Sequence, residues 1–316
     1  VLEGGGGGTR LDGGTGVNTA SLVRANGGRN VTVGADSIVS SGANAGFGFG
    51  DDVFANVVSI VGSEHNDTFT LAPDALAVDG GGGIDRLDLS LLTGPLHVQL
   101  AAAPGTAAAG VVRVTGFESF GGGEGADTIV AELGGGLIEG LGGDDSLAAA
   151  GGRAEGGAGA DSLGGSGAAT LRGDEGDDWL IGLGGLNTLS GGEGADTLRG
   201  SAGDTLQGGA GRDIFVIGAT DDSPPEARIR VMDFLPGEDM LDLRAIGAAI
   251  GGWAPDRYRF GEPITEAGQV RPRGVASPEH GIELLCINTD DDLADFEVII
   301  EFAFFRFVRE ADIIWE

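Results

Sequence analysis

Aspartate residues recur at regular intervals inside glycine-rich segments, and their carboxylates are the groups of this chain best suited to chemistry. The nine-residue pattern G-G-x-G-x-D-x-U-x, where U is a large apolar residue, occurs at residues 80–88, 122–130, 156–164, 191–199 and 208–216, with close variants at 140–148 and 173–181. Glycine permits a tight turn whose backbone carbonyls point inward, and the aspartate adds a carboxylate. Calcium prefers oxygen ligands of these two kinds. The pattern therefore indicates repeated calcium sites.

Each nonapeptide ends in a short apolar segment that predicts a strand, so two nonapeptides make one coil of a solenoid. One edge of the solenoid then carries an aspartate in every coil, 16 to 18 residues apart: Asp127, Asp145, Asp161, Asp178, Asp196 and Asp213. The opposite edge carries Ala169, Asn187 and Asp204, and its earlier turns near 134–136 and 151–152 have no acidic residue at the equivalent place. We therefore expect one row of about five calcium ions and one degraded row.

The apolar U positions predict a ladder of stacked side chains inside the solenoid. They are Leu147, Leu163, Leu171, Leu180, Leu189, Leu198, Leu206 and Phe215. The expected fold is all-β, a parallel β-roll of glycine-rich nonapeptides with a C-terminal β-rich cap, since a solenoid needs its open end covered. So thin a core does not stabilise the chain alone, and calcium binding is expected to be a condition of folding.

The composition is strongly acidic. The 316 residues include 64 glycines and 49 Asp plus Glu against 18 Lys plus Arg, which gives a formal net charge of -31. Nucleic acid is therefore an improbable partner, and bound cations are expected to offset the self-repulsion. The alternative is a solvated acidic surface like that of halophilic proteins. The single cysteine, Cys286, excludes an internal disulfide, so a metal must provide any cross-linking.

The chain divides by composition into three predicted domains. Residues 1–120 read as a degenerate solenoid with irregular coils, for example residues 13–18 and 62–69, and with strands at 30–33 and 96–100. Residues 121–216 read as the regular β-roll. Residues 217–316 read as a packed unit rich in aliphatic, aromatic and arginine residues, with an alternating strand at 296–302. No apolar run is long enough for a transmembrane helix. No signal peptide is visible and the sequence does not begin with Met, so we expect an excised or processed piece of a longer protein.

The nonapeptide is the known calcium-binding signature of RTX (repeats-in-toxin) proteins, so the chain resembles an RTX exoprotein. The segments 222–224, 231–234, 237–243, 288–292 and 311–315, in this order, resemble the C-terminal domain of serralysin-type metallopeptidases. The resemblance is good over 121–316 and loose before it. It implies type I secretion directed by an uncleaved C-terminal signal, here followed by the charged Glu316. The type I machinery is accordingly an expected partner.

In that family the turn carbonyls and the sixth-position aspartate hold calcium. The candidate metal ligands on the matching positions are Gly123, Gly125, Asp127, Asp145, Gly157, Ala158, Gly159, Asp161, Asp174, Gly176, Asp178, Gly192, Gly194, Asp196, Gly209, Gly211 and Asp213. Asp67, Asp85, Asn187 and Asp204 are further candidates. The acidic run 290–295 is either one more site or, more commonly for such a run, a solvated loop.

No catalytic motif is apparent, and we expect no enzyme activity from this chain. A serralysin peptidase needs a His-Glu-x-x-His helix, whereas His65, His97 and His280 are not at ligand spacing. The serine in residues 160–164 lies inside a repeat whose aspartate is assigned to calcium, and Cys286 lies in an apolar run. A carboxylate pair for glycan chemistry explains the regular Asp spacing less well than calcium does.

Two classes of function are consistent with the sequence. The first is a C-terminal folding and secretion module of a larger exoenzyme, such as a protease, lipase or polysaccharide epimerase. The second is a structural or adhesive surface protein of the S-layer or biofilm type, whose solenoid self-assembles or binds cell-surface glycans. A ligand-binding face in the first 120 residues is a third hypothesis, which rests only on their irregularity.

Overall fold

The computed structural model describes most of the repeat region and isolated strands elsewhere. The described residues are 2–3, 10–12, 19–21, 29–33, 38–42, 52–55, 59–71, 77–92, 97–100, 105–107, 112–115, 117–131, 135–219, 222–224, 226–245, 270–276, 281–287, 296–302 and 312–314. They fall into two compact units, Val1–Glu155 (unit 1) and Gly156–Glu316 (unit 2), and strand β18 (Arg153–Ala158) spans the boundary. Among these residues no helix has the length and apolarity needed to cross a membrane.

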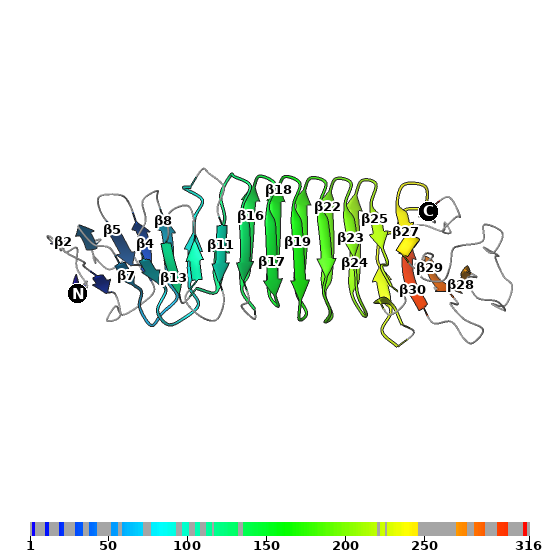
Figure 1. Ribbon diagram of the computed structural model, residues 1–316, viewed down its shortest axis with the longest axis horizontal. Helices are drawn as coiled ribbons and strands as arrows, with labels where there is room; N and C mark the ends of the chain where they lie inside the picture. Colours follow the sequence, from blue (N-terminus) through cyan, green and yellow to red (C-terminus); the bar gives the residue numbers. More distant parts are fainter. Residues whose placement is uncertain are drawn as a thin grey trace. The chain divides into compact units, whose positions relative to one another are not determined.

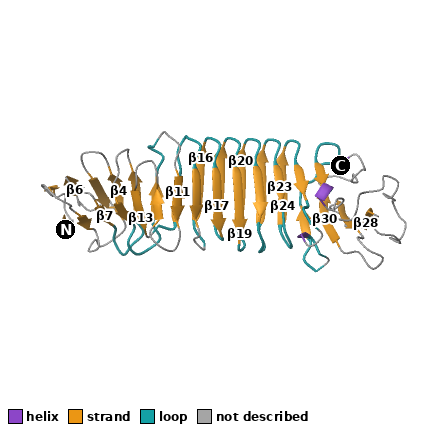
Figure 2. Ribbon diagram, viewed as in Figure 1, coloured by secondary structure: helices purple, strands orange, loops and turns teal. Residues whose placement is uncertain are grey.

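Unit 2 is a parallel β-roll built from two sheets, whose strands stand side by side in Figure 1 and are joined by short turns in Figure 2. Sheet A2 has the order β19 (Ser162–Ser166), β21 (Trp179–Gly182), β23 (Thr197–Arg199), β25 (Ile214–Val216), β27 (Met240–Asp242) and β31 (Ile313–Ile314). Sheet B2 has the order β20 (Thr170–Glu175), β22 (Thr188–Glu193), β24 (Thr205–Ala210), β26 (Ile229–Val231), β30 (Phe296–Phe302), β29 (Gly281–Ile287) and β28 (Val270–Ala276).

Successive coils of unit 2 pair in the register that the repeat predicts. In sheet A2, Leu163 faces Leu180, Leu180 faces Leu198, and Leu198 faces Phe215. In sheet B2, Leu171, Leu189 and Leu206 form the matching ladder. All of these side chains are buried, as is Leu147 of unit 1, because the period of two along each strand sends every U residue inward. The predicted parallel β-roll and its apolar ladder are confirmed.

The C-terminal part of unit 2 changes the pairing pattern. Strands β26 and β27 continue the parallel sheets, and β30 pairs parallel with β26. Strands β29 and β28 then extend sheet B2 with antiparallel pairing, β29 to β30 and β28 to β29. The predicted strand at 296–302 is therefore confirmed as β30. The aromatic residues Trp253, Tyr258, Phe260 and Trp315, the acidic run 290–295 and Glu316 lie outside the described residues.

Unit 1 contains two sheets of the same kind, interrupted by hairpin excursions. Sheet A1 has the order β1 (Leu2–Glu3), β3 (Thr19–Ser21), β7 (Ser59–Val61), β9 (Ala77–Asp79), β13 (Val112–Thr115), β12 (Gly105–Ala107), β11 (His97–Leu100), β15 (Thr128–Ala131) and β17 (Ser146–Ala150). Sheet B1 has the order β2 (Arg10–Asp12), β6 (Asp52–Ala55), β5 (Ile38–Gly42), β4 (Arg29–Val33), β8 (Thr68–Leu71), β10 (Arg86–Asp88), β14 (Ser119–Gly121) and β16 (Leu137–Gly142).

The excursions of unit 1 are antiparallel: β5 joins β4 to β6, and β12 joins β11 to β13. The irregular coils and the strands at 30–33 and 96–100 that the sequence predicts are thus present as β4 and β11, whereas residues 13–18 lie outside the described residues. The compositional boundaries at 120/121 and 216/217 stay predictions.

Candidate metal centre

Four aspartates of unit 2 form a continuous row on what we call the first edge, the turns that lead into sheet A2. Asp161, Asp178, Asp196 and Asp213 are all buried. Each donates its backbone N–H to Oδ1 of the aspartate in the next coil, at 2.8 Å from Asp161 to Asp178, 2.9 Å from Asp178 to Asp196 and 3.0 Å from Asp196 to Asp213. These bonds orient one carboxylate per coil in the same way.

The second carboxylate oxygen is different. Oδ2 of Asp178, Asp196 and Asp213 is buried and has no hydrogen-bond partner. Burial raises the pKa of Asp178 to about 7 and the pKa of Asp196 and Asp213 to about 6, although the backbone hydrogen bond to Oδ1 opposes the rise. A buried carboxylate oxygen without a partner costs free energy, so the row lacks a positive group.

Beside each of these oxygens lies a small space, which we call the cradle, that exists because the adjacent residue is glycine. A Cβ on Gly191 would collide with Oδ2 of Asp196 and would lie 2.5 Å from the carbonyl oxygen of Gly208. A Cβ on Gly173 would collide in the same way with Oδ2 of Asp178 and would lie 2.7 Å from the carbonyl oxygen of Gly191. A carboxylate oxygen and a carbonyl oxygen therefore converge in both of these coils, which is the donor set that suits calcium.

The turn residues that the resemblance singled out stack from coil to coil. Gly157, Gly159, Gly176, Gly192, Gly194, Gly209 and Gly211 all have positive φ, and Asp174 adopts φ 78° where the other coils have glycine. The carbonyl of Gly176 lies against the Cα of Gly194, leaving no space for a side chain there. Ala158 is exposed in the same turn as Gly157. These carbonyls thus line the same edge as the aspartate row.

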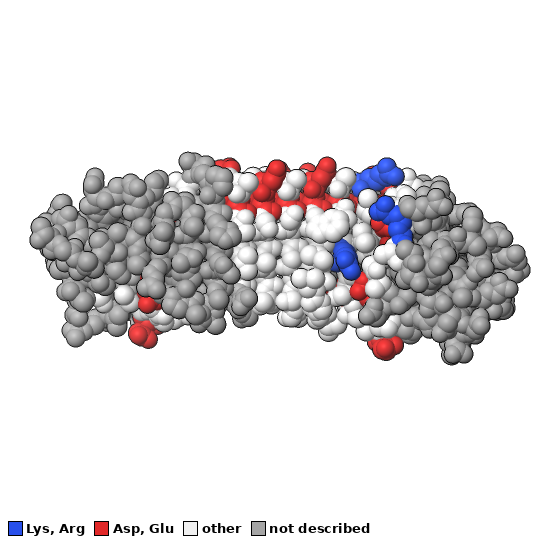
Figure 3. Space-filling view, in the orientation of Figure 1, with Lys and Arg blue, Asp and Glu red and all other residues white. Residues whose placement is uncertain are grey.

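Within the described residues, no three His, Cys, Asp or Glu side chains gather into a metal-binding group. This is consistent with the donor set, because each coil offers one sixth-position carboxylate and the remaining oxygens belong to the backbone. Around this edge, Glu175, Asp177 and Glu193 are exposed. Figure 3 shows acidic side chains gathered along the upper edge of the view, above a largely uncharged face.

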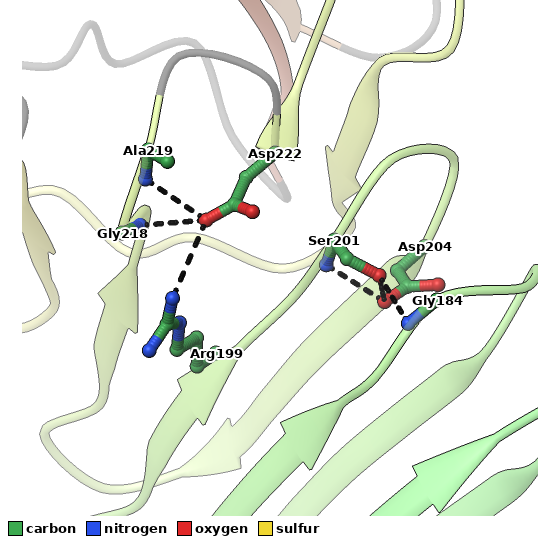
Figure 4. A network of polar contacts seen from close by, with 7 residues as sticks. All are labelled: Gly184, Arg199, Ser201, Asp204, Gly218, Ala219 and Asp222. Carbon is green, nitrogen blue, oxygen red and sulfur yellow. Dashed lines mark hydrogen bonds and ion pairs between the residues drawn. The ribbon is translucent and has the colours of Figure 1, made fainter.

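The second edge of unit 2 consists of the turns that lead into sheet B2. Its backbone N–H groups bond to Oδ1 atoms as on the first edge, but its other side-chain polar atoms have different partners. Ala169 N–H donates to Oδ1 of Asn187 at 2.9 Å, and Asn187 N–H donates to Oδ1 of Asp204 at 2.7 Å. Asn187 Nδ2 donates to the carbonyl of Gly184. Oδ2 of Asp204 accepts both the N–H and the hydroxyl of Ser201, as Figure 4 shows. Protein donors therefore occupy the place that is open on the first edge.

In unit 1 the predicted ligands divide in a similar manner. Asp127 donates its N–H to Oδ1 of Asp145 at 2.7 Å, but Oδ2 of Asp127 accepts the N–H of Gly123 at 2.8 Å, and the carbonyl of Gly123 accepts the N–H of Gly142. Gly125 is half-buried in the same turn. Oδ2 of Asp127 is thus bonded to a backbone N–H of its own turn.

Asp67 and Asp85 lie in turns that lead into sheet B1, not into the sheet that follows Asp127. Asp67 N–H donates to Oδ1 of Asp85 at 2.7 Å, and Oδ2 of Asp67 accepts the N–H of Ser63 at 2.6 Å. Oδ2 of Asp85 is buried with no hydrogen-bond partner, and burial raises its pKa to about 7. Asp85 therefore has a buried Oδ2 without a hydrogen bond, like Asp178. Oδ2 of Asp67, like that of Asp127, accepts a backbone N–H of its own turn.

The first-edge row includes one further aspartate, Asp239, which was not among the predicted ligands. Asp213 N–H donates to Oδ1 of Asp239 at 3.1 Å, so Asp239 continues the row. The signal was present, because residues 237–241 keep the G-x-D-x-U part of the nonapeptide. Oδ2 of Asp239, however, accepts the N–H of Leu235 at 2.6 Å. The carboxylates with an unbonded Oδ2 therefore end at Asp213.

Comparison with known proteins identifies the family of this chain. Residues 105–314 match the family described as peptidase M10 serralysin C terminal. No curated protein matches the chain. Among solved structures, the AlgE6R3 subunit of the mannuronan C5-epimerase from Azotobacter vinelandii is 23% identical over 60% of this chain and 78% of that chain, with a TM-score of 0.28, a likeness too low to define the fold. The family match spans well over half of the chain, so the chain belongs to the peptidase M10 serralysin C-terminal family and is an RTX-type repeat module.

Proposed function

We propose that this chain is a calcium-binding RTX module that folds on binding calcium, after export through a type I secretion channel. In this proposal it is the non-catalytic C-terminal folding and secretion part of a larger extracellular protein. The supporting observation is the row of buried, unpartnered Oδ2 atoms of Asp178, Asp196 and Asp213, each beside a glycine whose Cβ would fill the adjoining space.

The residues of the first edge have distinct roles in this proposal. The N–H groups of Asp161, Asp178 and Asp196 hold the carboxylates in register. The Oδ2 atoms and the stacked turn carbonyls are the ligands. A bound calcium ion supplies the positive charge that these oxygens lack.

The expected energies make calcium decisive for folding. An extracellular site with an affinity near ~0.1 mM contributes roughly 1.4 kcal/mol in about 1 mM calcium. About five such sites contribute roughly 7 kcal/mol, which is similar to the whole stability of an ordinary domain. Where free calcium is low, repulsion among the acidic groups of a chain with net charge -31 favours the unfolded state. An unfolded chain is the form that passes an export channel.

The test is a calcium titration of the chain, starting in chelator, followed by circular dichroism and light scattering. We expect a cooperative gain of β signal at sub-millimolar to millimolar calcium and a monomeric product. Magnesium at the same concentration is the control, because its preference for octahedral geometry with retained water suits these rigid carbonyl cradles poorly. A chain already folded in chelator and indifferent to calcium would contradict the proposal. Calcium-dependent filaments or sheets would favour the structural or adhesive function instead.

A further inference from the structure

The regular roll of unit 2 loses its next coil after β24. Strands β22 and β24 pair at five positions, from Thr188 with Thr205 to Glu193 with Ala210. Between β24 and β26 only two residue pairs form, Thr205 with Arg230 and Leu206 with Val231. The backbone of the turn that begins at Gly208 is therefore left without a following strand.

The side chain of Asp233 takes the place of that strand. Gly208 N–H donates to Oδ1 of Asp233 at 2.9 Å, and Gly209 N–H donates to Oδ2 at 2.9 Å. Both carboxylate oxygens are thus occupied by backbone donors. In a regular coil the strand of the next coil provides such acceptors through its carbonyls.

The same turn borders the last open carboxylate of the row. A Cβ on Gly208 would collide with Oδ2 of Asp213, so Gly208 forms the cradle of that oxygen. Asp233 therefore holds the backbone of the cradle in place. Burial raises the pKa of Asp233, and the N–H groups of Gly208 and Gly209 oppose that rise by stabilising the ionised form.

The residues that follow Asp233 close the row from the other side. The ring of Phe234 packs on Phe215 with the centroids 5.9 Å apart. Asp239 accepts the N–H of Asp213 through Oδ1 and the N–H of Leu235 through Oδ2. Residues 233–239 thus act as one segment that contacts the last coil through its turn, its core and its aspartate.

We propose that Asp233 is a positioning residue for the last calcium site, the site at Asp213, where it replaces the backbone acceptors of a missing coil. The segment 233–239 ends the row because the carboxylates of Asp233 and Asp239 both bind backbone N–H groups. This inference rests on the proposed calcium function for the site itself, but the capping contact of Asp233 stands independently of calcium.

The test compares Asp233→Asn with Glu226→Gln, a control that removes the same charge from an exposed residue of the same part of unit 2. The asparagine keeps one acceptor and turns an N–H₂ group toward the second backbone donor. We expect Asp233→Asn to bind one calcium ion fewer by native mass spectrometry. We also expect amide exchange at Gly208 and Gly209 to be about tenfold faster, which corresponds to one lost hydrogen bond. Glu226→Gln should change neither.

The outcomes separate the two proposals. A wild-type chain that binds calcium, with Asp233→Asn unchanged in ion number and exchange, overturns the role of Asp233 and leaves the calcium function intact. A wild-type chain that binds no calcium, with faster exchange in Asp233→Asn, supports the capping contact and sinks the calcium function. If Asp233→Asn yields no folded protein, Asp233→Glu decides, since it keeps both acceptor oxygens. Folding of Asp233→Glu supports the acceptor role, and its failure would overturn it.

Discussion

Asp196 on the first edge and Asp204 on the second edge occupy the same position of their repeats and accept the same kind of backbone N–H through Oδ1. They differ at Oδ2. In Asp204 this oxygen accepts the N–H and the hydroxyl of Ser201, whereas in Asp196 it is buried without a hydrogen bond. On the second edge the chain itself supplies hydrogen-bond donors to this oxygen, whereas on the first edge the oxygen has none, and this is where we propose that calcium binds.

The cause lies in the turn before each aspartate. On the first edge, residues four positions before the aspartates, such as Asp174 and Gly192, pair with each other in sheet B2. The strands of sheet B2 therefore extend into the turn before each of these aspartates. On the second edge, Ser201 lies between strands β23 and β24 and donates its N–H to Asp204. In this comparison, the aspartate with an unbonded Oδ2 is the one preceded by a turn into which the strands extend.

The largest expected effect comes from filling the cradle. Gly191→Ala puts a methyl group against Oδ2 of Asp196 and the carbonyl of Gly208, and should cost about 3 kcal/mol together with one calcium ion. The control is Gly184→Ala on the second edge, where no atom lies within 4 Å of the added Cβ and only the positive φ of 73° is unfavourable, at about 1 kcal/mol. Urea unfolding in calcium measures both. Equal costs would contradict the distinction between the edges.

A reciprocal exchange of Asp and Asn tests the comparison more finely. Asp196→Asn keeps the Oδ1 acceptor but removes the charge, and should lose one ion and roughly 1.4 kcal/mol of stability in tenfold excess calcium. Asn187→Asp loses the bond from Nδ2 to the carbonyl of Gly184, and should cost about 2 kcal/mol without gaining an ion.

Equilibrium dialysis with calcium and urea unfolding report on both exchange variants. An additional ion in Asn187→Asp would show that side-chain identity alone separates the edges, and that the turn geometry does not.

A third effect is pH dependence. The pKa of Asp178 rises to about 7 in the fold and the pKa of Asp196 and Asp213 to about 6, from an ordinary value of 3.8. Because the folded form without metal binds protons more tightly than the unfolded form, its stability is highest below about pH 4 and is lost as the pH rises through 6 to 7.

In chelator, circular dichroism should therefore show more β structure at pH 5 than at pH 8. In calcium the trend reverses, because protons compete for the same oxygens, and the calcium midpoint should move upward on acidification. A midpoint that stays constant between pH 8 and pH 5 would argue against these carboxylates as ligands.

The repeat period alone determined the parallel β-roll, the inward ladder from Leu163 to Phe215 and the row of aspartates, because a fixed spacing in a solenoid places equivalent residues on the same edge. Local patterns also placed β4, β11 and β30. Only the tertiary structure decided which carboxylates are open. Asp67, Asp127, Asp204 and Asp239 look like Asp85 and Asp196 in the sequence, yet their Oδ2 atoms accept backbone N–H groups. The physical reason is that a backbone N–H that bonds to a neighbouring strand is not free to bond to a carboxylate. Strand pairing between coils is a property of the assembled sheets. The role of Asp233 was hidden for the same reason, since the strand that it replaces is absent only in three dimensions.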